Sequence, residues 1–170
     1  MNIKLIGSIM IILSCGGFGF RIAAAHRADM RVLRELIGVL DYMECELNYR
    51  LTPLPQLCRQ AASESKRSIK PVLLRLAEEM DNQISPDIDR CMHTAIESCN
   101  SIPKETKECL LELGESLGKF DLNGQLLELK SVRNLCRRKY EALNTNKDVR
   151  LRSYQALGLC AGAAIAILLI

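Results

Sequence analysis

Three carboxylates on one segment come nearest to a catalytic arrangement. Asp41, Glu44 and Glu46 are close in sequence, but on a helix the first two are surface neighbours while Glu46 points elsewhere. No histidine accompanies them, and the chain's two histidines, His26 and His93, stand in no triad context. Because Ser and Cys nucleophiles need a positioned base, we expect no enzyme activity and no catalytic residue.

Patterns for cofactors and nucleic acid are also missing. The phosphate-binding pattern G-x-x-x-x-G-K-[ST] occurs nowhere in the chain. Its eight cysteines include no C-x-x-C pair, so a zinc site lacks clustered ligands, and they are most simply small buried hydrophobic side chains. A net charge of +3, no Trp and 4% aromatic residues argue against nucleic acid. We expect no cofactor and no metal.

The same charged segment is our candidate for a partner interface. Five residues crowd one predicted helix immediately before a rigid Thr-Pro-x-Pro turn, namely Asp41, Glu44, Glu46, Tyr49 and Arg50. We predict that they contact a partner protein. The alternative is that the charges form a solvated face and that Tyr49 packs against the next helix.

Two glycines within a helical pattern require a reason. Gly114 and Gly118 recur in the segment LGESLG at residues 113–118, and each interior helical glycine costs about 1 kcal/mol relative to alanine. Close helix contact at Gly114 and a helix end at Gly118 would supply that reason. The functional alternative is a partner-binding turn, so both residues join the interface candidates.

The elements that must position these residues are predicted to be helices throughout. Between Asp29 and Leu51 the apolar residues recur at steps of three and four, which places one stripe on a helix face: Met30, Leu33, Ile37, Leu40, Met43 and Leu47. Five later start signals carry prolines or capping residues: Thr52-Pro53, Pro71, Ser85-Pro86-Asp87, Pro103 and Asp121. Nothing alternates at period two, so the expected fold is all-α, a six-helix bundle.

The last predicted helix is longer than the others. No proline or glycine occurs between Gly124 and Gly158, so a helix that Asp121 caps can run unbroken into the C-terminal apolar run. The segment at residues 144–146, NTN, is weak in helix propensity and is where a bend would occur.

An uncharged apolar run lies at each end of the chain. Residues 5–20 and 154–170 contain no charged side chain, whereas 22 of the 23 Lys and Arg lie between them. The positive-inside rule then predicts a cytoplasmic middle with both termini across the membrane. The expected parts are an N-terminal transmembrane span (1–25), a cytoplasmic helical bundle (26–152) and a C-terminal span (153–170), with the first and last helices of the bundle continuing into the spans. A cleaved signal peptide is the alternative for the N-terminus.

Small residues mark one side of each predicted span. Gly158, Gly162 and Ala166 form the small-xxx-small ridge through which transmembrane helices pack closely. Its partner could be the glycines of the first span, Gly16, Gly17 and Gly19, or the same ridge in another copy of the chain. We favour the first pairing, since the bundle already brings the two spans together.

The combination of motifs resembles a known family. The segments MECELNYRLTPLP (43–55), LGESLG (113–118) leading to Asp121 and Gly124-Gln125, and YQALG (154–158) are similar to those of stage III sporulation protein AB of endospore-forming Firmicutes. The resemblance covers length, both terminal runs and the order of motifs.

That resemblance implies a function. It implies a platform protein, similar to those of type II secretion and type IV pilus machines, in the channel complex between mother cell and forespore. Its location would be the mother-cell membrane around the forespore. The expected partners are the secretion-type ATPase, stage III sporulation protein AA, docked on the cytoplasmic face, and other channel-complex proteins. The alternatives are a small membrane-anchored regulator and a self-associating structural membrane protein.

Overall fold

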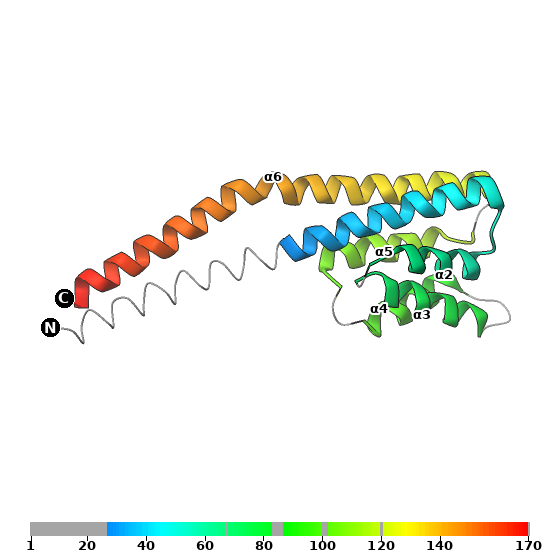
Figure 1. Cartoon of the computed structure of the whole chain (residues 1–170), viewed down its shortest axis with the longest axis horizontal. Helices are drawn as coiled ribbons and strands as arrows, with labels where there is room; N and C mark the ends of the chain where they lie inside the picture. Colours follow the sequence, from blue (N-terminus) through cyan, green and yellow to red (C-terminus); the bar gives the residue numbers. More distant parts are fainter. Residues whose placement is uncertain (1–26, 67, 83–86, 100–101, 120, 170) are drawn as a thin grey trace. The chain divides into compact units, whose positions relative to one another are not determined.

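The structure is a computed structural model that describes residues 27–66, 68–82, 87–99, 102–119 and 121–169, with the backbone alone from residue 146 onward. Within these ranges the chain forms six helices and no strand (Figure 1). The expected all-α class is therefore confirmed for the described residues.

The first helix covers residues 27–50 and buries the predicted stripe. Met30, Leu33, Leu40, Met43 and Leu47 are all buried, and Ile37 is half-buried. Because Val32, Leu36 and Val39 are buried as well, the apolar face is wider than the stripe, as a helix with neighbours on two sides requires.

Four short helices follow: α2 (Leu54–Glu64), α3 (Lys70–Asp81), α4 (Ile88–Glu97) and α5 (Lys104–Ser116). Pro71 lies in the first turn of α3, as predicted. Pro53 and Pro103 stand one position earlier than the first helical position and immediately precede α2 and α5. Asp87 likewise precedes α4 without a side-chain cap, and Ser85 and Pro86 lie outside the described residues.

The last helix, α6 (Leu122–Leu169), is 48 residues long and passes through residues 144–146 without a break. Asp121 caps it, since its Oδ1 accepts a hydrogen bond from the Gly124 N–H at 3.0 Å. The predicted cap and the predicted continuity are both confirmed. A few residues of weak propensity cost only some tenths of a kcal/mol each relative to good helix formers.

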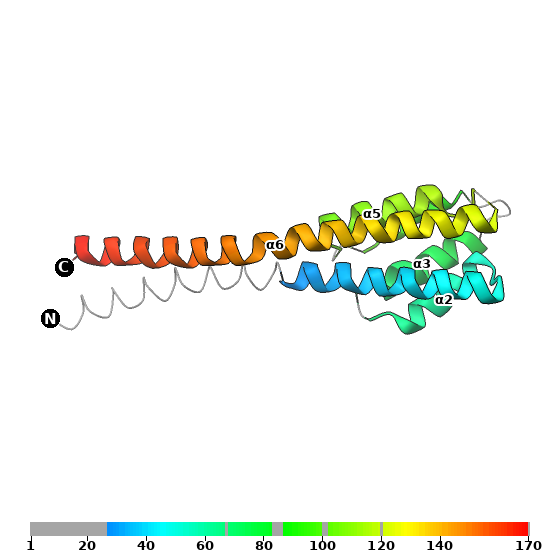
Figure 2. The same ribbon diagram turned by 90° about the horizontal axis from the view of Figure 1, so that it is seen from above.

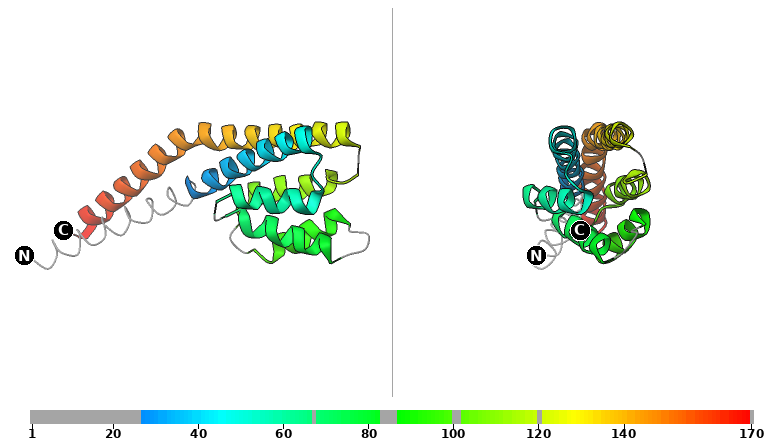
Figure 3. Two further views of the ribbon diagram at one scale, coloured as in Figure 1. Left: turned by 45° about the vertical axis from the view of Figure 1, so that its right-hand side comes forward. Right: turned by 90° about the vertical axis from the view of Figure 1, so that its right-hand side faces the viewer.

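The chain divides into two compact units, which are described separately. Residues 31–141 form the helical bundle, in which α2 packs on α3, α3 on α4 and α4 on α5. Figure 2 shows this bundle from above, and the end-on view in Figure 3 shows its helices following one another around it in chain order. Successive helices run in opposite directions, so the connections at 51–53 and 117–121 share one end, here called the Leu51 end, and the start of α5 lies at the other, the Lys104 end.

A single apolar core fills the bundle. Its largest fully buried side chains come from every helix: Leu33, Leu36, Leu40, Met43, Leu57, Ile69, Leu73, Leu76, Met92, Leu110, Leu113 and Leu129. Full burial of such a side chain is worth roughly 1.5–3 kcal/mol, so packing of these faces, rather than helix propensity, holds the short helices.

The second unit comprises residues 1–30 and 142–170. The predicted N-terminal span, with Gly16, Gly17 and Gly19, lies outside the described residues. Gly158, Gly162 and Ala166 lie on the helical backbone of α6. No helix in the described part of the chain is both long enough and apolar enough to cross a membrane.

Candidate partner interface

Asp41 and Glu44 are engaged by α6. The Nη1 of Arg133 donates to Asp41 Oδ1 at 2.8 Å and to Glu44 Oε2 at 2.5 Å. Lys130 Nζ lies 3.5 Å from Glu44, and Arg137 Nη2 lies 3.9 Å from Asp41. These contacts join residues about 90 positions apart in sequence, which is why no local pattern pointed to Arg133. We call this cluster the ion-pair seam.

Partial burial gives the seam its strength. Only 21% of the Arg133 side chain and 20% of the Glu44 side chain are exposed, so solvent screens this pair less than an exposed one. One guanidinium serves two carboxylates, and loss of it would leave both without their principal partner. The seam therefore fixes the first helix against the start of α6.

Glu46 lies at the edge of the core. It is 9% exposed, and its Oε1 accepts from Arg50 Nη1 at 3.2 Å and from the Tyr42 hydroxyl at 3.5 Å. Desolvation, followed by the charge of Glu46, raises the pKa of Tyr42 above its ordinary value, so this hydroxyl stays a proton donor. Glu46 is thus satisfied within its own helix, while the Arg50 side chain is 72% exposed.

Tyr49 does not pack against the next helix. It is 79% exposed, and nearby Leu51 is 64% exposed with φ of +52°. On α6, Leu127 is 67% and Leu122 37% exposed. The sequence did not single out Leu127, which is two residues from the buried Leu129 on α6 and so faces another direction.

Gly114 and Gly118 occupy close contacts inside the bundle. A Cβ at Gly114 would lie 2.6 Å from Met92 Cβ, so α5 and α4 approach as closely as predicted. Gly118 has φ of +79° two residues beyond the end of α5, and a Cβ there would overlap Ile88 Cδ1. Close packing and a helix end, the two structural reasons predicted for these glycines, are both present.

The cysteines that the structure describes are free thiols, and four of them are buried. Burial raises the pKa of Cys58 to about 12. The pKa of Cys136 is raised by its hydrogen bond with Cys109 and by burial. The same hydrogen bond lowers the pKa of Cys109. Thiols with a raised pKa are poor nucleophiles, and the described residues contain no group of three or more His, Cys, Asp or Glu that could hold a metal ion.

A second ion pair joins α5 to α6. Lys139 Nζ donates to Glu108 Oε2. This hydrogen bond lowers the pKa of Glu108 and raises that of Lys139. Glu108 is at the surface, so the pair is screened by solvent and contributes less than the seam.

Comparison with known proteins gives a consistent result. The family model described as stage III sporulation protein AB matches residues 4–170. The chain is 22% identical over 170 residues to stage III sporulation protein AB of Bacillus subtilis (strain 168), a match that covers 98% of this chain and 99% of that protein. A solved structure of stage III sporulation protein AB shares the fold with a TM-score of 0.61 and 20% identity, over 72% of this chain and 98% of that one. With nearly the whole chain matched and the helical bundle in common, the chain belongs to the stage III sporulation protein AB family.

Proposed function

We propose that this chain is a non-enzymatic platform subunit of the channel complex between mother cell and forespore, needed for endospore formation. Its helical bundle would dock the secretion-type ATPase, stage III sporulation protein AA, on the cytoplasmic face. Membership of a sporulation family supports the biological setting. Pairing of Asp41 and Glu44 with Arg133, and the raised pKa of the buried Cys58 thiol, support a scaffold over a catalyst.

The continuity of α6 carries the proposal. One helix begins at the capped Leu122 within the bundle and ends at Leu169, in the C-terminal apolar run. A helix without proline or a break transmits displacement along its axis, because each residue is hydrogen-bonded to the next turn. A platform needs such a connection between the domain that meets an ATPase and the part of the chain that lies in the membrane.

The proposal includes a membrane location. Both apolar runs would span the mother-cell membrane around the forespore, with the bundle in the cytoplasm and both termini outside it, as the charge distribution favours. Reporter fusions to the C-terminus test this orientation: activity of an externally active reporter is expected, and activity of a cytoplasmic reporter would exclude it.

Co-purification from sporulating cells tests the partner. A tagged full-length chain is isolated with the ATPase gene present and with it deleted, and co-purifying proteins are identified by mass spectrometry. We expect the ATPase, together with other channel-complex proteins that remain when it is deleted. Recovery of channel proteins without the ATPase would reject the docking role and leave a structural membrane protein.

The self-associating alternative makes a different prediction. If the chain acts by packing of its glycine ridge between copies, Gly158→Leu should abolish assembly in membranes while bundle variants leave it intact. Under the platform proposal, substitutions on the bundle surface should reduce recovery of the ATPase, and Gly158→Leu should not, because the ATPase would bind the bundle surface.

A further inference from the structure

The Leu51 end carries an exposed apolar surface. Tyr49, Leu51 and Leu127 are 79%, 64% and 67% exposed, and Leu122 is 37% exposed. We call these four residues the apolar end patch. They are four of the five exposed large hydrophobic side chains among the described residues; the fifth, Leu74, lies on α3, across the bundle from α6.

The register of two helices gathers these residues. The seam pairs Arg133 with Glu44 and Arg137 with Asp41, so the first helix and α6 run antiparallel, and later residues of the first helix lie level with earlier residues of α6. Continuing this register by a few residues at 1.5 Å each places Leu127 level with Tyr49 and Arg50. Leu122, the first residue of α6, lies at the same end of the bundle as the turn at Leu51.

Leu51 adds an independent observation. Its φ of +52° lies in the left-handed region, which a leucine adopts rarely and which glycine or asparagine occupies more easily. Burial of the side chain does not compensate for this conformation, because 64% of the residue is exposed. Strained residues of this kind concentrate at binding sites.

Charges of both signs border the patch: exposed cations flank Tyr49 and Leu127, and the exposed carboxylate of Asp121, whose Oδ1 accepts from the Gly124 N–H, precedes Leu122. The Arg50 and Lys130 side chains are 72% and 51% exposed. Nearby carboxylates are occupied: Glu44 by Arg133 and Glu46 by Arg50 and Tyr42. Glu128, beside Leu127 on α6, is half-buried.

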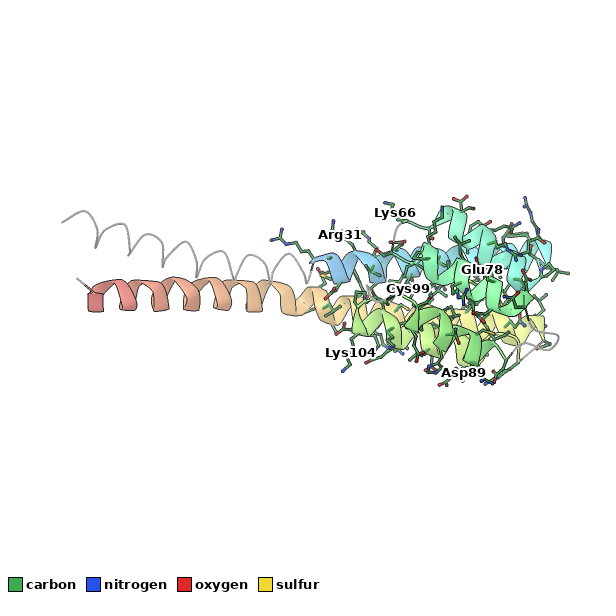
Figure 4. The ribbon with its side chains drawn as sticks, turned by 90° about the horizontal axis from the view of Figure 1, so that it is seen from below. Arg31, Lys66, Glu78, Asp89, Cys99 and Lys104 are labelled. Carbon is green, nitrogen blue, oxygen red and sulfur yellow. The ribbon has the colours of Figure 1, made fainter. Side chains whose placement is uncertain are left out.

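We infer that the apolar end patch docks an apolar segment of another protein that places a carboxylate against Arg50. The inference deepens the proposed function and rests on it where the ATPase is named as that protein. A second copy of the chain fits less well, because a two-fold contact at the patch would bring both copies' Arg50 and Lys130 together. Figure 4 shows the other charged regions of the bundle, with Arg31, Lys66 and Lys104 toward the Lys104 end.

Photocrosslinking in sporulating cells tests the inference on the full-length chain. Benzoylphenylalanine is placed at position 49, at position 127 and, as a control on α3, at position 74, where Leu74 is 37% exposed. Each version is examined with the ATPase gene present or deleted, and with or without Arg50→Glu. Adducts are identified by mass spectrometry.

We expect positions 49 and 127, but not 74, to crosslink to the ATPase, with adduct yield reduced at least about tenfold by Arg50→Glu. An adduct of both positions with a different channel protein, unchanged without the ATPase and lost in Arg50→Glu, would support the patch and reject the ATPase as its partner. ATPase adducts only at position 74 would overturn the patch and keep the proposed function. Adducts only with lipid or a second copy, or no adduct at 49 and 127, would overturn the inference.

Discussion

The first helix and α6 carry two neighbouring features built from opposite kinds of residue. In the ion-pair seam, Arg133 holds Asp41 and Glu44 with most of its side chain covered. One to two turns along the same helix, Tyr49 is 79% exposed, and Leu127 on α6 is 67% exposed. Charged groups are thus partly buried where the helices meet, while apolar groups face solvent at the Leu51 end.

This contrast separates stability from recognition. Partly buried charges hold two helices in register when each has a partner, because an unpaired one would carry a desolvation cost. Exposed apolar side chains do nothing for the folded chain alone, and they gain free energy only when another surface covers them. We therefore expect seam variants to change folding and patch variants to change binding.

Removal of the seam's guanidinium should have the largest effect. Arg133→Met keeps the length of the side chain but leaves Asp41 and Glu44 without their principal partner, and we expect unfolding free energy to fall by about 2–3 kcal/mol. Urea unfolding of the full-length chain in one detergent, followed by helical circular dichroism, measures it. Arg138→Met is the matched control, because Arg138 is exposed and has no ion pair with the residues that the structure describes. Equal midpoints for the two variants would remove the seam's structural role.

The turn that leads into the patch depends on Gly118. An alanine there would have a φ of +79° and a Cβ that overlaps Ile88, so Gly118→Ala should cost about 2 kcal/mol. Gly38 is exposed within the first helix, and an added methyl there would meet open space, so Gly38→Ala should raise stability by about 1 kcal/mol. Opposite shifts in the urea midpoint are expected. Stabilisation by both alanines would show that the turn tolerates a side chain.

Leu51 offers a smaller test with an unusual sign. Leu51→Asn places a residue that tolerates the left-handed region at φ +52°, and stability should rise by about 0.5–1 kcal/mol while docking weakens. Leu74→Asn, on an ordinary helical backbone of α3, should instead lower stability by roughly 0.5 kcal/mol. If Leu51→Asn destabilises the chain as much as Leu74→Asn does, the strain at Leu51 has no energetic consequence.

Acid should weaken the exposed ion pair slightly, which is the smallest effect. The pKa of Glu108 is lowered in the folded chain by its hydrogen bond with Lys139. The ion pair therefore stabilises the fold fully above the pKa of Glu108 in the unfolded chain, and this stabilisation is lost as the pH falls through its pKa in the folded chain. Melting temperatures of the wild type and Glu108→Gln should differ near neutral pH and converge in acid, below the lowered pKa that Glu108 has in the folded chain. A difference that persists in acid would assign the effect to packing.

Local patterns predict most of the fold. The spacing of apolar residues by three and four positions correctly predicts the buried face of the first helix. Asp121 is predictable as a helix cap and Gly118 as a helix end, because a capping carboxylate and a positive φ each depend on the residue type at that position. Local patterns do not reveal ion pairs between residues about 90 positions apart, so the sequence does not point to Arg133. For the same reason Asp41 and Glu44 look available to a partner in the sequence, although Arg133 of α6 binds both of them. The exposure of Leu51 and Leu127 depends on how the helices pack against one another, which the spacing of apolar residues in the sequence does not predict.

We propose that the seam stabilises the bundle and that the patch binds a partner, and one paired measurement tests this division most directly. Affinity for the purified ATPase and melting temperature are measured together for full-length Leu127→Glu and Arg133→Met in lipid nanodiscs. We predict that Leu127→Glu weakens binding at least about tenfold with an unchanged melting temperature, and that Arg133→Met lowers the melting temperature with unchanged affinity below it. Unchanged affinity in Leu127→Glu, or lost affinity in a folded Arg133→Met, would contradict this division of roles.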